Sequence, residues 1–319
     1  MEDFVIESRA LTKTFSLGAG FFARADKKVY AVNDVSFGIE RGKTYGLVGE
    51  SGCGKTTTAR LLVKMYRSDG GEIIYSPKDG EKCDVALLSG KNLRAYREKV
   101  KYVFQDPSRS LNPRMSVFGI LSSAYRWSSL WRGKASAREE AASLLEEVGL
   151  DPSDLDRRPS EFSGGQRQRI SIARGLIMKP DVLICDEVVS ALDVSVQGQI
   201  LNLLQELRAS RSLSFLFIAH DLRVSGWFCD KIGVMYSGVL LEEANACDLY
   251  KTAAHPYTKL LYDGSMGKSG AGEVRTVLSS PTACPFVLRC KSASARCRES
   301  LPAWTKIADG HRVRCHLFS

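Results

Sequence analysis

The sequence predicts an α/β protein with a mixed, mostly parallel β-sheet, and three observations support this fold class. Residues 182–185 and 213–218 are short, predominantly apolar runs of the kind found in strands buried on both faces of a sheet. Residues 196–209, which lie between them, have helical character, and strand–helix–strand alternation is typical of parallel strands joined by crossover helices. Residues 43–48 form another apolar run, which leads through a glycine-rich turn into a helical segment.

Further elements are predicted in the N-terminal half. Residues 16–28 are rich in Gly, Ala and Phe between two strand-like runs, which predicts a loop or a loose hairpin. The glycine-rich turn is followed by a helix at about residues 55–65. Residues 135–148 carry apolar side chains at helical spacing, and Gly149 is a suitable residue to end that helix.

The C-terminal half continues the alternation and then loses it. A helix is expected at about residues 167–178. Residues 231–242 predict two strands that turn at Ser237 and Gly238. Beyond about His255 the pattern decays, so we expect a domain boundary near residue 250.

The composition is that of an ordinary globular protein. Apolar residues make up 44% of the 319 residues and charged residues 25%, and this length allows one large domain or two unequal ones. The start Met1-Glu2-Asp3 lacks the basic-then-apolar profile of a signal peptide. No uncharged apolar run approaches the roughly 20 residues that span a bilayer. We therefore expect a soluble chain whose role at a membrane, if any, is peripheral.

The net charge of +9, from 45 basic and 36 acidic residues, discriminates little between functions. A basic balance suits nucleic acid, anionic lipid or nucleotide phosphates, and also a mildly basic surface without a specific partner. No basic run with interleaved aromatic residues predicts a nucleic-acid platform. We expect no nucleic-acid partner.

A phosphate-binding loop is predicted between the strand at residues 43–48 and the helix that follows. Eight residues fit the pattern G-x-x-x-x-G-K-[ST], with Thr57 directly after them: Gly49, Glu50, Ser51, Gly52, Cys53, Gly54, Lys55 and Thr56. The glycines let successive backbone N–H groups face the phosphates, and the helix N-terminus adds partial positive charge. Lys55 is expected to reach the β- and γ-phosphates, and the Thr56 hydroxyl to hold Mg²⁺.

Two carboxylates and a histidine follow the buried strands. Asp186 and Glu187 end the strand at residues 182–185, at the sheet edge where α/β proteins bind ligands. Asp186 is expected to support Mg²⁺ and Glu187 to act as general base on the attacking water, although such a pair alone also suits a helix cap. His220 follows the next strand, where it can contact a γ-phosphate or orient the water, or be purely structural.

A second anion-binding element precedes the helix at residues 167–178. It consists of Ser163, Gly164, Gly165 and Gln166, at a predicted helix N-terminus. One chain thus carries two phosphate-binding elements for one nucleotide. The economical explanation is that two chains meet head to tail and each completes the other's site.

This set of motifs resembles the ATP-binding cassette ATPases in order and spacing over about residues 5–250. The matching positions are the phosphate loop, Gln105, the Ser-Gly-Gly-Gln element, the strand ending in Asp186 and Glu187, residues 190–193, and His220. Phe162 departs from the family's commoner leucine. The resemblance implies a RecA-like core with a mixed sheet, a helical subdomain at about residues 106–165, and ATP and Mg²⁺ as ligands. It also implies that Gln105 contacts Mg²⁺ and links the site to that subdomain, and that Asp193 belongs to a loop crossing a dimer interface.

The family usually stacks an upstream aromatic residue on adenine. Phe15 is the best match here and Tyr30 is the alternative, while an aromatic that belongs only to the core is also possible.

Two stretches resemble the oligopeptide, dipeptide and nickel importers of this family. They are residues 105–114 and the His255-Pro256-Tyr257 start of a C-terminal extension. The resemblance implies an ATPase motor on the cytoplasmic face of the membrane, coupled to two permease subunits, a second and paralogous cassette ATPase, and an extracytoplasmic binding protein. Peptide is the leading cargo, with nickel chelate and oligosaccharide as alternatives. A soluble ATPase acting on nucleic acid or ribosomes, and a regulatory subunit without hydrolysis, are the competing functions.

The extension, residues 251–319, contains Cys284, Cys290, Cys297 and Cys315, separated by five, six and seventeen residues. Four thiolates in a short segment suit a [4Fe–4S] cluster or a Zn²⁺ site. The resemblance favours the iron–sulfur cluster, while free thiols or a disulfide remain open. His311 and His316 are alternative ligands that we expect to flank the site.

Overall fold

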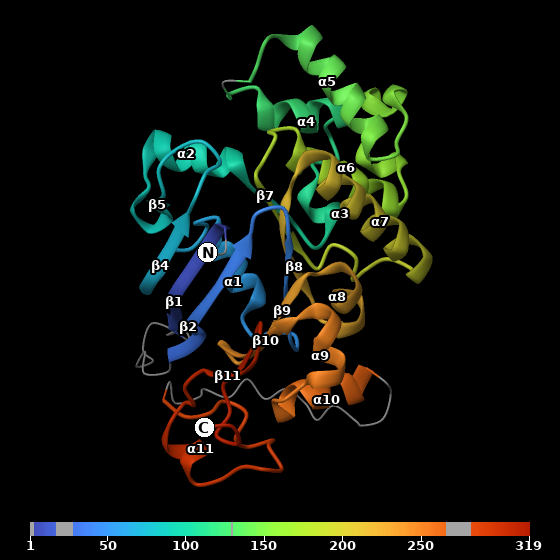
Figure 1. The fold of residues 1–319 in the computed structure, drawn as a ribbon. Coiled ribbons are helices and arrows are strands. Elements are labelled where there is room, and N and C mark those ends of the chain that lie inside the picture. Colours follow the sequence, from blue (N-terminus) through green and yellow to red (C-terminus); the bar gives the residue numbers. More distant parts are fainter. Residues whose placement is uncertain (1–2, 17–27, 129, 266–281) are drawn as a thin grey trace, which may run out of the picture. The chain divides into compact units, whose positions relative to one another are not determined.

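The computed structural model describes residues 3–16, 28–128, 130–265 and 282–319 (Figure 1). The chain forms two compact units, one of residues 1–87 and 217–319 and the other of residues 88–216. Both contain helices and parallel strand pairs, which confirms the α/β fold class. Most of the loop predicted at residues 16–28 lies outside the described residues.

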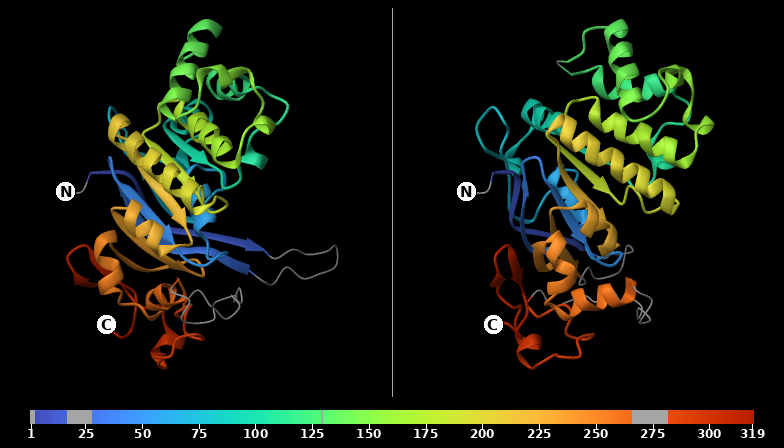
Figure 2. Two further views of the ribbon diagram at one scale, coloured as in Figure 1. Left: turned by 90° about the vertical axis from the view of Figure 1, so that its right-hand side faces the viewer. Right: turned by 45° about the vertical axis from the view of Figure 1, so that its right-hand side comes forward.

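The first unit begins with an antiparallel sheet in the order β2-β1-β4-β5. Its strands are β1 (Phe4–Ser16), β2 (Lys28–Glu40), β4 (Gly70–Tyr75) and β5 (Cys83–Asp84). Strands β1 and β2 run side by side as a long ribbon, which Figure 2 shows from two directions. Apolar side chains of these two strands are fully buried and form part of the core, among them Val5, Leu11, Val32, Val35 and Ile39.

A mixed group of strands forms the rest of this unit's sheet structure. Strand β3 (Thr44–Val48) pairs parallel to β9 (Lys231–Tyr236), and β9 pairs antiparallel to β10 (Val239–Asn245). The turn between β9 and β10 is at Ser237 and Gly238, as predicted, and both residues have positive φ, as tight hairpin turns require.

Two strands from the C-terminal extension extend this arrangement. Strand β12 (His311–Val313) pairs with β10, and β11 (Thr305–Ala308) pairs with β12. The extension is therefore hydrogen-bonded to β10 by its own backbone.

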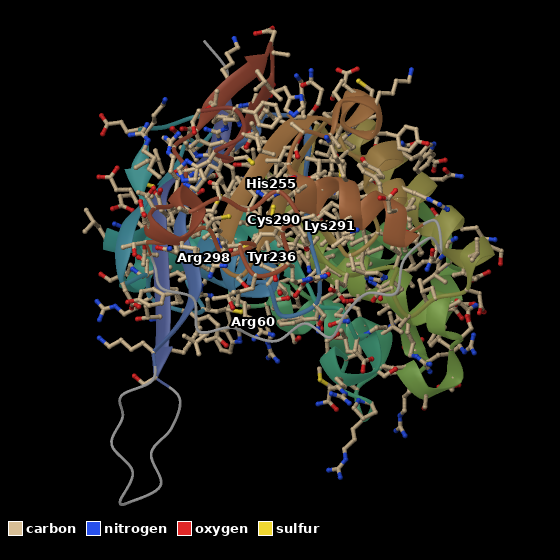
Figure 3. The ribbon with its side chains drawn as sticks, turned by 90° about the horizontal axis from the view of Figure 1, so that it is seen from below. Arg60, Tyr236, His255, Cys290, Lys291 and Arg298 are labelled. Carbon is tan, nitrogen blue, oxygen red and sulfur yellow. The ribbon has the colours of Figure 1, made fainter. Side chains whose placement is uncertain are left out.

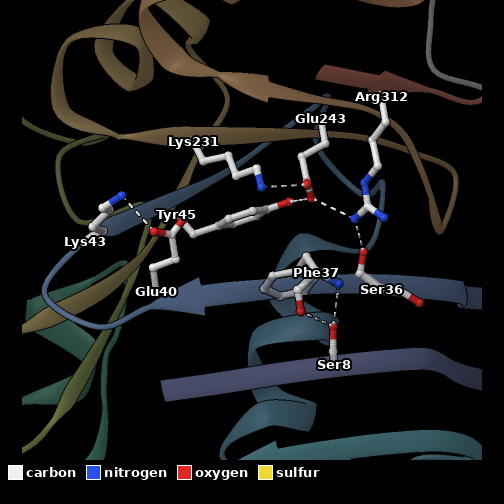
Figure 4. A network of polar contacts seen from close by, with 9 residues as sticks. All are labelled: Ser8, Ser36, Phe37, Glu40, Lys43, Tyr45, Lys231, Glu243 and Arg312. Carbon is white, nitrogen blue, oxygen red and sulfur yellow. Dashed lines mark hydrogen bonds and ion pairs between the residues drawn. The ribbon is translucent and has the colours of Figure 1, made fainter. Parts of the chain in front are cut away.

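A buried carboxylate fastens β12 to the core (Figure 4). Glu243 Oε2 on β10 accepts hydrogen bonds from the Tyr45 hydroxyl at 2.7 Å and from Arg312 of β12 at 3.1 Å, and its other oxygen lies 3.3 Å from the Lys231 ammonium. Arg312 also donates to the Ser36 carbonyl at 2.9 Å. Breaking one member of such a network leaves a buried charge without its partner, so the extension is held firmly at this point.

Short helices complete the first unit. They are α1 (Lys55–Leu62), the 3₁₀ turn η1 (Val85–Leu87), α8 (Leu222–Phe228), α9 (Ala246–Thr252), α10 (Pro256–Ser265) and α11 (Arg296–Glu299). Helix α1 ends at Leu62, before the expected residue 65, because Lys64 adopts a left-handed backbone conformation with φ of 53°. Strand β8 (Ser214–Ala219) spans the boundary between the two units.

The second unit combines one parallel strand pair with most of the long helices. Strand β6 (Val100–Val103) pairs parallel to β7 (Val182–Asp186). The helices are α2 (Gly90–Lys99), α3 (Pro107–Ser110), α4 (Val117–Tyr125), α5 (Lys134–Glu147), η2 (Pro152–Asp156), η3 (Pro159–Glu161), α6 (Gly164–Leu176) and α7 (Val194–Arg211).

The predicted helices of this unit are present, with one early start. Helix α5 covers the expected segment, and the Gly149 N–H bonds back to the Glu146 carbonyl, as expected of a helix end. Helix α6 begins at Gly164 instead of residue 167, because Ser163 caps it. Among the described residues, no helix has both the length and the apolarity to cross a membrane.

Candidate nucleotide-binding site

The predicted phosphate loop connects β3 to α1 in the first unit, and two of its glycines are required by close packing. A Cβ atom on Gly49 would lie 2.1 Å from the Met235 carbonyl oxygen. Gly54 has φ of 112°, and a Cβ there would lie 2.2 Å from the Ala31 carbonyl oxygen. Any side chain at either position would push the loop away from its neighbouring strands.

Lys55 places a positive charge inside this loop. Its side-chain nitrogen donates to the carbonyls of Gly49 at 2.7 Å and Glu50 at 2.9 Å, and the residue is only 3% exposed. A buried ammonium is stable only when such acceptors satisfy it. The loop therefore holds a cation at its centre, as anion binding requires. Burial raises the pKa of the neighbouring Cys53 thiol, which keeps it neutral.

Thr56 and Thr57 lie in the first turn of α1, directly after Lys55. The N–H groups of this turn have no carbonyl partner earlier in the helix, so they are directed outward from its N-terminus. Hydroxyls and amides at this position suit the oxygen atoms of a phosphate and its counter-ion.

In the second unit, Asp186 is the last residue of strand β7 and Glu187 follows it directly. Asp186 is buried and accepts a hydrogen bond from the Tyr102 hydroxyl on β6. Glu187 has a left-handed backbone with φ of 50°, which is uncommon for a residue with a side chain and is typical of functional positions. The Gln105 amide donates to a Glu187 carboxylate oxygen at 2.7 Å. The structure thus brings together two residues predicted separately.

The Ser-Gly-Gly-Gln element forms a reciprocal cap on α6. The Ser163 hydroxyl accepts from the Gln166 N–H at 3.3 Å, and the Gln166 side chain accepts from the Ser163 N–H at 2.9 Å. Gly164 and Gly165 occupy the first turn, where the helix dipole favours an anion. Phe162 packs against the Arg157 guanidinium, 4.4 Å from its ring centre, which gives a physical use for the aromatic ring at this position.

Asp193 and His220 are both exposed. Asp193 is the N-cap residue of α7 and makes no capping bond with its side chain. His220 directly follows β8. Of the predicted residues, the phosphate loop and His220 belong to the first unit, whereas Gln105, Asp186, Glu187, Asp193 and the α6 cap belong to the second.

The two candidate adenine-binding aromatics lie on neighbouring strands of the first unit. Phe15 is 36% exposed, with Tyr66 edge-on at 5.5 Å and the Lys13 ammonium 5.5 Å from its ring centre. Tyr30 pairs with Thr14 on β1 and is half-buried. Phe15 therefore has exposed ring surface that a base can cover.

The four cysteines of the extension line one cavity of about 170 Å³, together with His255 and His316. Burial raises the pKa of Cys284 to about 11 and also raises that of Cys315, so these thiols stay protonated unless a cation binds. Among the described residues, no three such side chains are grouped closely enough to hold a metal ion.

One of the alternative ligands is excluded by its surroundings. His311 is buried, bonds to Glu242 at 2.7 Å, and lines a different cavity from the cysteines. His316 lines the cysteine cavity, but its ring nitrogens contact Ser300 and Ser319. His255, which was expected only to mark the extension, is buried there, and burial lowers its pKa to about 3, so it is neutral.

Two contacts to the phosphate loop were not predicted. The Tyr257 hydroxyl accepts from the Glu50 N–H at 2.9 Å, and Arg289 bonds to the Glu50 carboxylate. Tyr257 belongs to the predicted His-Pro-Tyr signal, but nothing in the sequence indicated which loop it reaches. For Arg289, the sequence indicated no function beyond its position next to Cys290.

Two segments of the chain match known protein families. Residues 32–190 match the family described as ABC transporter, and residues 241–297 match the one described as oligopeptide/dipeptide transporter, C-terminal region. Oligopeptide transport ATP-binding protein AppF of Bacillus subtilis is 39% identical over 100% of this chain and 98% of its own length. A probable peptide ABC transporter ATP-binding protein of Sinorhizobium fredii is 40% identical over 99% of this chain and 91% of its own.

Solved structures share the fold. The ATP-binding cassette MJ0796, in a dimeric post-hydrolysis state bound to ADP and Pi, matches with a TM-score of 0.65 at 23% identity, over 76% of this chain and 98% of that one. The cbiO1 protein of Clostridium perfringens, part of an ABC transporter complex, matches with a TM-score of 0.66 at 24% identity, over 79% of this chain and 92% of that one.

Proposed function

This chain belongs to the ABC transporter family of ATP-binding proteins, and from that premise we propose that it is the ATP-hydrolysing motor of an oligopeptide or dipeptide importer. The observation that carries the proposal is the buried Lys55 ammonium at the centre of the glycine-rich loop. The names of the relatives and the matched C-terminal region support peptide as the cargo.

We assign the residues of the hydrolytic step as follows. Lys55 and the loop N–H groups bind the β- and γ-phosphates. Thr56, Gln105 and Asp186 offer oxygen atoms of the kind that suits Mg²⁺, which neutralises phosphate charge when bound. Glu187 takes a proton from the attacking water. A hydrogen bond from Gln105 holds the Glu187 carboxylate in place.

The remaining site residues act around the nucleotide. His220 orients the water or contacts the γ-phosphate, and Phe15 or Tyr30 stacks on adenine. Ser163, Gly164, Gly165, Gln166 and Asp193 serve the nucleotide of a second, paralogous ATPase. Ser163 and Asp193 are exposed and all five residues lie at helix N-termini, which supports this role, because a site completed by another chain needs accessible groups.

The transport step is carried out by partner subunits. ATP binding closes the two ATPases, and the region around Gln105 passes closure to two permease subunits at the cytoplasmic face of the membrane. An extracytoplasmic binding protein selects the cargo, so this chain does not contact it.

For the extension we propose residues 251–319 as a cysteine module that holds a [4Fe–4S] cluster, with Zn²⁺ as the alternative. The shared cavity of Cys284, Cys290, Cys297 and Cys315 supports it, since four buried or half-buried sulfurs are the ligand set such a cluster requires. The role we assign is structural, because the sequence around the four cysteines offers few apolar residues with which to fold alone.

The test is reconstitution of the chain with its permeases and partner ATPase in vesicles. We expect ATP-dependent peptide uptake that Lys55→Ala abolishes. Uptake of nickel chelate or oligosaccharide, but not of peptide, would overturn the cargo. ATP hydrolysis that nucleic acid or ribosomes stimulate, without any uptake, would overturn the importer itself.

A further inference from the structure

An arginine of the cysteine extension contacts the phosphate loop. Arg289, next to Cys290, bonds to the Glu50 carboxylate with both terminal nitrogens, at 2.7 and 3.0 Å. The side chains are 22% and 15% exposed, so the pair is largely shielded from water. Such a two-point contact is more directional than an ordinary ion pair, because the planar guanidinium matches the carboxylate.

Aromatic rings hold this arginine in place. The guanidinium lies 5.7 Å from the ring centre of Tyr236 and 5.8 Å from that of Phe286. Tyr257 packs against both rings, at 4.6 and 5.4 Å. Figure 3 labels Tyr236, His255, Cys290 and Arg298 in a view of the side chains from below. The Arg289 side chain is therefore already ordered where it meets the loop, which limits the entropy lost in forming the contact.

Glu50 is tied to its surroundings by main-chain bonds as well. Its N–H donates to the Tyr257 hydroxyl at 2.9 Å, and its carbonyl accepts from Lys55 at 2.9 Å. A carboxylate in this loop is electrostatically unfavourable for binding a triphosphate, because like charges repel at short range. Arg289 offsets that charge.

We propose that Arg289 is a positioning residue for the nucleotide: the extension uses it to neutralise Glu50 and to fix the phosphate loop, and so sets the affinity for ATP. The inference rests on the proposed function, in which this loop binds ATP. It gives the extension a role in the ATPase cycle, because any change that loosens the segment around Cys290 also withdraws the arginine from the loop.

The experiment is a double-mutant cycle on the full chain, with the Kd for ATP measured by titration. Arg289→Ala leaves Glu50 unpaired beside the phosphates, and we expect ATP binding about tenfold weaker, the size of one uncompensated charge at this range. Glu50→Gln removes the repelling charge, and we expect binding about threefold tighter. The double variant should return to within about threefold of the wild type, because no unpaired anion remains.

Three controls separate electrostatics from unfolding. Arg298→Ala removes an exposed arginine of the same extension and should leave the Kd unchanged. Arg289→Lys keeps the charge and should recover most of the affinity. The Arg289→Ala effect should shrink in high salt, because salt screens charge.

The outcomes are distinguishable. Equal losses in Arg289→Ala and Glu50→Gln, with a double variant at least as weak as either, would mean a purely structural contact and would overturn the inference. An unchanged Kd in Arg289→Ala would overturn it too. A wild-type chain that binds no ATP would instead defeat the proposed function.

Discussion

Glu187, the proposed general base, combines a left-handed backbone with a hydrogen bond from the Gln105 side chain. Its place after a buried strand predicted a carboxylate at the sheet edge, and the structure confirms that place. Its left-handed backbone and its bond from Gln105, 82 positions away, were not predictable. Such contacts depend on tertiary packing, which motif spacing does not encode.

The general-base assignment leads to a direct prediction. Glu187→Gln should slow ATP hydrolysis by about 10²-fold or more, the scale of a lost general base, while ATP binding stays nearly intact. Turnover and the Kd for ATP in the assembled transporter check this. Glu206→Gln, which changes an exposed glutamate on α7, is the matched control. An undiminished rate in Glu187→Gln would show that another group activates the water.

The residues that contact the phosphate loop also could not be predicted from the sequence. The pattern of residues 49–56 predicted the phosphate loop and its two flanking elements. Glu50 nevertheless meets Tyr257 and Arg289, which lie 207 and 239 positions further along the chain. The loop is recognisable in the sequence because its glycines and lysine follow a fixed local pattern. The residues that hold it in place come from a distant segment and follow no such pattern.

At the scale of elements, the helices and strands that were predicted are present with the expected type, and their ends were predicted less accurately. Helix α5 and the β9–β10 hairpin match the predictions because periodicity and turn residues define them locally. Helix α6 starts early because Ser163 and Gln166 cap each other, a pattern visible in the sequence but interpreted there only as an anion site.

Two glycines in helices of the second unit should respond oppositely to alanine. A Cβ on Gly198 of α7 meets nothing within 4 Å, so Gly198→Ala should raise the free energy of unfolding by about 0.5–1 kcal/mol through helix propensity. A Cβ on Gly175 of α6 would lie 2.9 Å from a Leu183 methyl carbon, so Gly175→Ala should lower it by about 1 kcal/mol or more. Chemical denaturation measures both. Destabilisation by Gly198→Ala would mean that α7 makes contacts at this face.

The extension is the part of the chain for which the sequence left the bound group most open, with an iron–sulfur cluster and zinc as the alternatives. We predict that anaerobically purified protein is brown and carries about four irons and four sulfides per chain, the composition of a cubane ligated by four cysteines. Cys290→Ser should bleach it and make the extension more sensitive to proteolysis. Cys247→Ser, which changes an exposed cysteine outside the cavity, should alter neither. Stoichiometric zinc without iron after anaerobic handling would contradict the cluster and show that the extension is stabilised by a zinc site instead.

At the scale of the whole molecule, the chain alone does not explain its second anion-binding element. The α6 cap presents a helix N-terminus in the unit that does not contain the phosphate loop. The head-to-tail pairing with a second ATPase that we propose would give both elements a nucleotide to bind. The motifs of this chain were sufficient to suggest this arrangement. Which ATPase pairs with it depends on the sequence of the partner.

The composite site makes the last prediction. Gly165→Asp puts a carboxylate where the partner's γ-phosphate should lie, so like-charge repulsion should block ATP-dependent association with the partner. A Cβ at this position also comes within 2.7 Å of a Val196 methyl carbon, so Gly165→Ala is the necessary control: it adds the same crowding without the charge and should be milder. Association is measured by size-exclusion chromatography with both ATPases present, in the Glu187→Gln background that preserves ATP. The Gly165→Asp chain should still bind ATP in its own phosphate loop, because that loop belongs to the other compact unit. Loss of this binding in a folded chain would contradict a site shared between two subunits.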